Sequence, residues 1–347
     1  MDLSCYNITE DGFSLEFLRI IDGIEKRTQM LGKDGFLVYE RIVAPPSQVR
    51  IISEILIAER QTGGHVQPLV FTGSDDWPVQ YLGIIARPTN EHTLIRAINE
   101  NILLSTNDIQ ILFGGPAYSG NKCSTSAFSA MFRNISQALF EADMKETNLV
   151  RTWLFMRDIS SNYCLLNEAR NKYFSKWFPD PNYILPASTG IQGITNCDSH
   201  LMVQFLAVSG NNCSIERVVS PLQCEPTKYG VMFSRALCIL LPLHKLMLIS
   251  GTASVNRHGK TIHATDCKAQ MMHALKTIKA ILHQQGGSFS DIIQATIYIK
   301  NKSDFEAVMK VLKNTPFPYE KSIVQIADIC RDDLLCEIEA IAVVPNN

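Results

Sequence analysis

Residues 264–312 read ATDCKAQMMHALKTIKAILHQQGGSFSDIIQATIYIKNKSDFEAVMKVL, a pattern that occurs twice in the chain. Apolar side chains recur at helical spacing from about Asp266 to Gln285, which predicts a helix with one buried face. Segment 291–300 is β-branched and alternating, which predicts a strand, and segment 301–312 predicts a second helix. The element order is therefore helix, strand, helix.

The earlier copy occupies residues 124–174, STSAFSAMFRNISQALFEADMKETNLVRTWLFMRDISSNYCLLNEARNKYF. Each copy follows a strand that ends in a glycine turn and precedes another long strand. This order predicts an α+β fold of two domains, each a mixed sheet with two helices packed on one face.

The first domain is expected to span residues 1–215, with its repeat core at about 108–209, and the second to span residues 216–347. Residues 1 to about 105 are less regular, with strands expected at 35–43 and 77–88. They form either a separate small domain or the first strands of the first copy.

The charge balance argues against nucleic acid or an anionic membrane as a partner, because 32 basic and 34 acidic residues are spread along the 347-residue chain. The longest apolar stretch, 231–251, contains Arg235, Pro242, His244 and Lys245, so no membrane span is expected. The ten cysteines and eight histidines lack zinc-site spacing, and no secretory leader is seen. We expect free thiols in a cytoplasmic protein with no metal and no cofactor.

The second copy carries the motifs ISGTASV (249–255) and CEIEAIAVV (336–344). With them it resembles the RidA (YjgF) family of small trimeric proteins, whose fold is chorismate-mutase-like. Members often act as imine deaminases that use an arginine and a glutamate. The resemblance places the glutamate at Glu337, whereas the arginine position holds Lys321.

The chain as a whole also contains VRTWLFMRDI (150–159), LPASTGIQG (185–193) and CRDDLLCEIE (330–339). In this two-copy form it is similar to the chorismatases, which release pyruvate from chorismate. Their one-chain, two-copy build matches the whole length here.

Alternation along the last strand puts Glu337 and Glu339 on one face, where the first copy has Met202 and Gln204. A solvated edge strand would explain the same pattern. Cleavage of an enolpyruvyl ether begins with protonation of the vinyl carbon, and burial keeps a carboxyl group protonated at neutral pH. We therefore take Glu337 as the general acid and Glu339 as a supporting or interface carboxylate.

Chorismate is a dicarboxylate, so cations and hydroxyls are expected around it. The substrate-binding candidates are Arg151, Arg170, Tyr173, Thr189 and Lys321, with Arg331 as a further arginine. For each of them a structural role, as a surface cation, a packed ring or a turn residue, is the alternative.

The resemblance also bears on the product. Chorismatases that form 3-hydroxybenzoate have a glycine and a cysteine where this chain has Gly251 and Cys330, while hydrolase-type members give a dihydrodiol acid. The product expected here is 3-hydroxybenzoate, and a small buried thiol is the structural alternative for Cys330. An imine deaminase and a non-catalytic binder of small carboxylates are the other functions considered. The chain is expected to be a monomer or a homotrimer.

Overall fold

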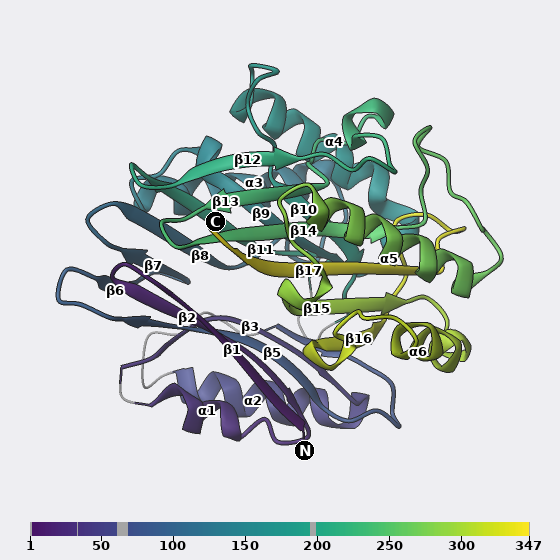
Figure 1. The fold of residues 1–347 in the computed structure, drawn as a ribbon, viewed down its shortest axis with the longest axis horizontal. Helices are drawn as coiled ribbons and strands as arrows, with labels where there is room; N and C mark the ends of the chain where they lie inside the picture. Colours follow the sequence, from purple (N-terminus) through teal and green to yellow (C-terminus); the bar gives the residue numbers. More distant parts are fainter. Residues whose placement is uncertain (1, 33, 61–68, 195–198, 347) are drawn as a thin grey trace.

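The computed structural model describes residues 2–32, 34–60, 69–194 and 199–346. It contains three mixed β-sheets whose helices lie on the outside of the molecule (Figure 1). The first sheet has the order β1-β2-β5-β3-β4. Its strands are β1 (Asp2–Glu10), β2 (Phe13–Ile21), β3 (Phe36–Ala44), β4 (Leu69–Thr72) and β5 (Gln80–Pro88), and its helices are α1 (Lys26–Leu31) and α2 (Pro46–Arg60).

The second sheet has the order β10-β9-β11-β8-β7-β6. Its strands are β6 (Leu94–Ile98), β7 (Asn101–Ser105), β8 (Ile109–Tyr118), β9 (Leu149–Met156), β10 (Ala187–Gln192) and β11 (Leu201–Gly210). Its helices α3 (Thr125–Glu141) and α4 (Ile159–Trp177) pack against each other over one face, and a 3-10 turn, η1 (Glu146–Asn148), precedes β9.

The third sheet has the order β12-β13-β14-β17-β15-β16. Its strands are β12 (Ser214–Val218), β13 (Ala236–Leu240), β14 (His244–Ala253), β15 (Ile292–Ile299), β16 (Ser322–Ile326) and β17 (Cys336–Pro345). Its helices are α5 (Cys267–His283) and α6 (Phe305–Lys313), and its 3-10 turns are η2 (Pro226–Tyr229), η3 (Phe289–Asp291), η4 (Lys302–Asp304) and η5 (Tyr319–Lys321). The helix, strand and helix predicted between 264 and 312 are thus confirmed.

The prediction of two domains is not confirmed, because the structure has three sheets and residues 2–88 build a third copy of the same topology. In each sheet the strand that comes last in the chain runs antiparallel to both of its neighbours. The edge strand that follows the second helix runs parallel to the strand that precedes that helix. Each sheet also has one register shift at an equivalent place, at Val38, Val150 and Ile293. The boundary expected at residue 215 falls inside β12, close to the start of the third sheet.

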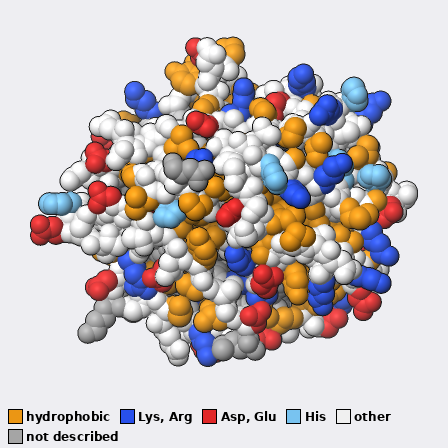
Figure 2. All heavy atoms as spheres, in the orientation of Figure 1, with side chains coloured by type: hydrophobic (Ala, Val, Ile, Leu, Met, Phe, Trp, Pro, Cys, Tyr) orange, Lys and Arg blue, Asp and Glu red, His pale blue; other side chains and the backbone are white. Residues whose placement is uncertain are grey.

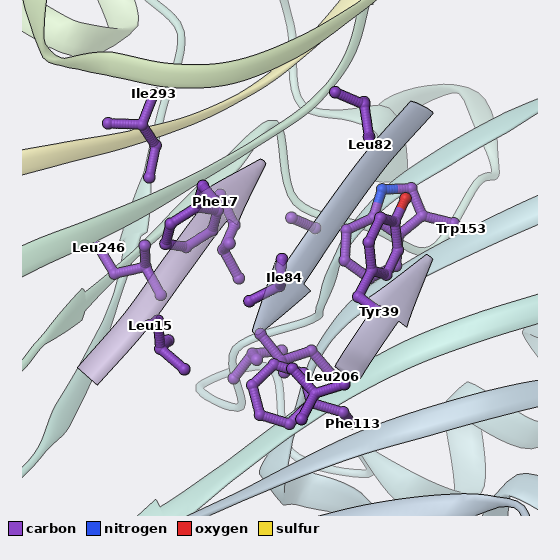
Figure 3. Packing of buried hydrophobic residues seen from close by; sticks show 14 of the residues in the cluster. Leu15, Phe17, Tyr39, Leu82, Ile84, Phe113, Trp153, Leu206, Leu246 and Ile293 are labelled. Carbon is purple, nitrogen blue, oxygen red and sulfur yellow. The ribbon is translucent and has the colours of Figure 1, made fainter. Parts of the chain in front are cut away.

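The three sheets turn their other faces towards one another and form a common apolar core. Figure 3 shows this core, with Leu15 and Phe17 from the first sheet, Trp153 from the second, and Leu246 and Ile293 from the third. Separate apolar clusters lie between each sheet and its own helices. Apolar burial on both faces explains why the strands read as nearly continuous hydrophobic runs.

The surface carries a mixture of charges, as the composition predicts. On the face drawn in Figure 2, basic and acidic side chains alternate with apolar and neutral ones. In the part of the chain that the structure describes, no helix is long and apolar enough to cross a membrane. The cysteines in these ranges are all free thiols.

Candidate active site

A cavity of about 260 Å³ lies where β10, the edge strand of the second sheet, meets β14 and β17 of the third. The two sheets are joined here by polar contacts. The Ser188 backbone N–H donates to the Ser250 hydroxyl over 2.8 Å, and the Gly251 N–H donates to the Thr189 hydroxyl over 3.0 Å. We call this space the Glu337 cavity. The charged and aromatic residues that line it include Tyr163, Arg170, Tyr229, Phe233, Arg235, Arg331 and Glu337.

Glu337 lies near the start of β17, between Ala253 of β14 and Tyr298 of β15. Its side chain reaches the cavity although the residue is only 5% exposed. Burial and, to a smaller extent, the negative charge of Glu339 together raise the pKa of this carboxyl to about 8, against the opposing effect of Arg235 and Arg151. Glu337 is therefore largely protonated at neutral pH, as a general acid must be.

Gly251 gives the Glu337 carboxyl its space. It lies where the register between β14 and β17 shifts, between Ile249 and Thr252. A Cβ atom on Gly251 would lie 1.9 Å from Glu337 Oε1 and 3.1 Å from Thr189 Cγ2. The glycine is therefore required by close approach of a side chain rather than by a left-handed backbone.

Three arginines give the cavity its positive charge. Arg170 on α4 is 1% exposed, donates to Asn167 and lies 3.5 Å from the Ser188 hydroxyl, while its Nε has no partner in the described structure. Arg235 directly precedes β13, and Arg331 lies in the loop before β17. Each donates to a backbone carbonyl, and each packs its guanidinium over a Tyr229 or Phe233 ring.

Cys330 is also part of the cavity wall. Burial, with a smaller contribution from Glu337, raises the pKa of its thiol to about 12. The thiol is therefore neutral at physiological pH and acts as a small apolar surface rather than as a nucleophile.

Glu339 lies two residues after Glu337 but outside the cavity lining. It accepts hydrogen bonds from Arg41 of β3 at 2.6 Å, from Arg151 of β9 at 2.7 Å and from the Tyr298 hydroxyl at 2.8 Å. Burial alone would raise the pKa of Glu339, but the two arginines hold it at about 2. Glu339 thus joins all three sheets as a permanently charged interface carboxylate.

The structure places several predicted binding residues outside the cavity. Arg151 faces Glu339 and the Trp153 ring, because a carboxylate from another sheet lies within reach. Thr189 accepts a hydrogen bond from Arg151 and lies behind the cavity wall. Tyr173 stacks on Phe132 in the α3–α4 aromatic cluster. Lys321 donates to the backbone carbonyls of residues 290 and 292.

One cavity does bring together the other predicted residues, which are Arg170, Arg331, Gly251, Cys330 and Glu337. Sequence reasoning missed Arg235 and the rings of Tyr163 and Tyr229. Arg235 could have been found, because a charged residue inside a long apolar stretch is costly unless it has a function.

The other two sheets lack an acid at the equivalent position. The register shifts at Val38, Val150 and Ile293 make Gln80 and Met202 the equivalents of Glu337. Gln80 is bonded to the backbone of Val324 through both its amide nitrogen and its oxygen. Within the described ranges, no cluster of His, Cys, Asp and Glu is suited to hold a metal ion.

Residues 231–344 match the family model described as Endoribonuclease L-PSP. Over 100 residues, 28% of this chain and 78% of the relative, the sequence is 31% identical to the 3-aminoacrylate deaminase RutC of Acinetobacter baylyi. The chain belongs to the family of this model and of RutC, as the RidA resemblance predicts.

Among solved structures, a chorismatase crystal structure aligns with 98% of this chain and 100% of its own, with a TM-score of 0.71 and 19% identity. The chain therefore shares the fold of a chorismatase over nearly all of the aligned length. A RidA of the Antarctic bacterium Psychrobacter sp. PAMC 21119 aligns with 37% of this chain and 100% of its own, at 22% identity and a TM-score of 0.31.

Proposed function

We propose that this protein is a chorismatase, which cleaves the enolpyruvyl ether of chorismate and releases pyruvate. The observation that carries the proposal is the buried Glu337 carboxyl, with a pKa of about 8, at the wall of a cavity lined by three arginines. The shared fold with a chorismatase supports it. The RidA-type relatives, by contrast, share only part of the chain.

Glu337 would donate its proton to the vinyl CH2 carbon of the enolpyruvyl group. This forms an oxocarbenium ion at the ether carbon. For 3-hydroxybenzoate, the neighbouring ring hydroxyl then displaces this activated group at the ring carbon: the bond between the ring carbon and the ether oxygen breaks, and its electron pair completes the carbonyl group of pyruvate. The hydroxyl proton returns to the Glu337 carboxylate, and the ring epoxide isomerises to the phenol, so that no water is consumed. In a hydrolase, water would add to the oxocarbenium carbon instead, and the hemiketal would collapse to pyruvate and the dihydrodiol acid. The carboxylate left on Glu337 lies near Arg235 and Arg151, which stabilise its negative charge after the transfer.

The charges of the cavity suit a dianion. With Glu337 protonated, Arg170, Arg235 and Arg331 provide three positive charges. Arg170 Nε has no partner in the described structure, and it is the donor we assign to a substrate carboxylate. The aromatic rings beside these guanidiniums hold them in place and offer an apolar wall to the substrate ring.

We further propose 3-hydroxybenzoate as the product. Gly251 leaves the carboxyl of Glu337 next to the β14 backbone, and the neutral Cys330 thiol contributes a small apolar wall. Such a wall favours attack by the substrate's own ring hydroxyl over attack by water. A chorismate hydrolase would give a dihydrodiol acid in place of the aromatic product.

We expect the protein to be a monomer, since its three sheets already bury their inner faces against one another. Light scattering would report the mass of one chain, whereas a homotrimer would give three times that mass.

The decisive experiment is incubation of the purified protein with chorismate, without added metal, beside a Glu337→Gln variant. A coupled assay follows pyruvate, and chromatography identifies the aromatic product. Pyruvate with 3-hydroxybenzoate, lost in the variant, is the expected result. Pyruvate with a dihydrodiol acid would overturn the product assignment, and binding without pyruvate would overturn the enzyme assignment.

The name of the RutC relative makes 3-aminoacrylate the substrate for a second assay. The lysine at the family's arginine position argues against an imine deaminase, because Lys321 is engaged by backbone carbonyls and does not line the cavity. Ammonia release from 3-aminoacrylate at a higher rate than pyruvate release from chorismate would favour the deaminase.

A further inference from the structure

The negative charge of Glu339 is fixed by contacts from all three sheets. One carboxylate oxygen accepts hydrogen bonds from Arg41 and Tyr298, and the other accepts one from Arg151. The Thr189 hydroxyl also donates to this carboxylate. Glu339 is only 4% exposed, so this charge is shielded from bulk solvent and held in place by its partners.

Glu339 and Glu337 project from the same face of β17, about 7 Å apart along the strand. The Thr189 side chain lies between them. Its hydroxyl accepts hydrogen bonds from Arg151 at 2.7 Å and from the Gly251 N–H at 3.0 Å. Its methyl group is directed towards the space above Gly251 that the Glu337 carboxyl occupies. The two carboxyl groups are therefore near neighbours across buried protein.

The other charged and titratable groups that face this pair come from several elements. They are Tyr39 and Arg41 from β3, Arg151 from β9, Tyr298 from β15, Arg235 before β13, and Cys330 from the loop before β17. The arginines favour ionisation of both carboxyl groups. Of the two carboxyl groups, Arg41 and Arg151 contact only Glu339, so that carboxyl ionises first and leaves Glu337 facing a negative charge.

We propose that Glu339 is a positioning residue for the reaction: its fixed negative charge, held by Arg41 and Arg151, adds to the effect of burial and helps to keep Glu337 protonated and ready to donate. Arg41 comes from the first sheet, which lines no part of the Glu337 cavity. The first sheet therefore serves the site by holding a charge and not by touching substrate. This inference rests on the proposed role of Glu337 as general acid.

The test is the pH profile of chorismate cleavage by a Glu339→Gln variant. The variant loses the negative neighbour and leaves two buried arginines without their carboxylate, and both changes favour ionised Glu337. The alkaline limb of kcat/KM is expected to move down by about one to two pH units, the size of one charge at about 7 Å in a partly polarisable site. An unchanged limb would overturn the proposal.

Glu10→Gln is the matched control. Glu10 is also a buried carboxylate, bonded to the Leu243 N–H at 2.9 Å and to His244 Nδ1 at 2.8 Å, but it lines no part of the cavity. Its removal should leave the alkaline limb in place. An equal shift in both variants would mean that loss of any buried carboxylate moves the limb, which would also overturn the proposal.

If the single variant does not fold, Arg41→Met combined with Glu339→Gln restores the net charge of the cluster, with Arg151 as its one cation. In this double variant the alkaline limb of kcat/KM should again lie at lower pH than in the wild type, but the shift should be smaller than in the single variant. A double variant with the wild-type limb would contradict the proposal.

A second readout does not depend on activity. Proteins labelled with 13C at glutamate carboxyl groups allow Glu337 to be titrated by NMR, with Glu337→Gln used for assignment. Titration of Glu337 at lower pH in Glu339→Gln is expected whether or not chorismate is the substrate. Absence of pyruvate in the wild type would reject the proposed function, whereas an unshifted Glu337 titration would reject this inference.

Discussion

Substitution of Gly251 by alanine should disable the site while leaving the fold intact. The added Cβ would lie 1.9 Å from Glu337 Oε1, and real Cβ contacts are essentially never shorter than 3.0 Å. The carboxyl must therefore move by about 1.1 Å. A displacement of this size at a reacting group typically costs about 100-fold in rate, which is about 2.7 kcal/mol of transition-state free energy.

The fold should tolerate this change, because the atom in the way is the end of a side chain next to an open cavity. Overpacking costs about 1–3 kcal/mol, and we expect the lower end of that range. Pyruvate release gives kcat/KM, and thermal melting by circular dichroism reports stability. The expected result is about a 100-fold loss of kcat/KM with a Tm lowered by a few degrees.

Gly190→Ala provides a matched comparison. Gly190 also lines the cavity, but its added Cβ would lie 3.4 Å from Tyr163 Cε2, which is an ordinary contact. It should lose far less activity than Gly251→Ala. If Gly251→Ala folds and cleaves chorismate as fast as the wild type, the Glu337 carboxyl does not need its present position, and its assignment as the acid fails.

Four further outcomes are expected. Cleavage should decline as the pH rises above about 8, because the pKa of Glu337 is raised to about 8 and only its protonated form donates. Folding raises this pKa, so wild-type stability falls as the pH rises through the window from about 4.3 to 8. Glu337→Gln escapes that loss and should melt higher than the wild type at pH 9, while its pyruvate release falls by about 10²–10⁴-fold. Arg170→Met should raise KM for chorismate more than it lowers kcat, whereas the exposed Arg133→Met should change neither value. Arg41→Met should lower the free energy of unfolding by about 3–5 kcal/mol in urea titrations, because Glu339 loses one of its two buried cations.

The sequence predicted the second and third sheets because each contains a 17-residue amphipathic helix, α3 or α5, before a buried strand. The first sheet was missed for a physical reason. Its corresponding helix, α1, has only six residues, so no long apolar stripe marks the repeat there. Its strands alone could not distinguish a third sheet from additional strands of the second.

Features of the site that depend on a single strand could be predicted from the sequence. Features that depend on contacts between two sheets could not. Alternation put Glu337 and Glu339 on one face, and the absence of acids at the equivalent positions marked that face as special. Side chains from other sheets determine which of these two carboxyl groups faces the Glu337 cavity and which one binds Arg151. Strand periodicity carries no information about those side chains. For this reason Arg151 was assigned to the substrate although it holds Glu339.

Three equivalent positions on three equivalent strands have three different roles. Glu337 faces the cavity, Met202 is buried in apolar surroundings, and Gln80 binds the backbone of Val324 in the third sheet. In an assembly of identical subunits every cleft must carry the same residues, so a residue cannot serve catalysis in one cleft and adhesion in another. A single chain removes that constraint. It allows hydrogen bonds to close the junction between the first and third sheets at Gln80, while the junction between the second and third sheets at Glu337 stays open. It also allows Arg41 and Arg151 to bind the same Glu339 carboxylate.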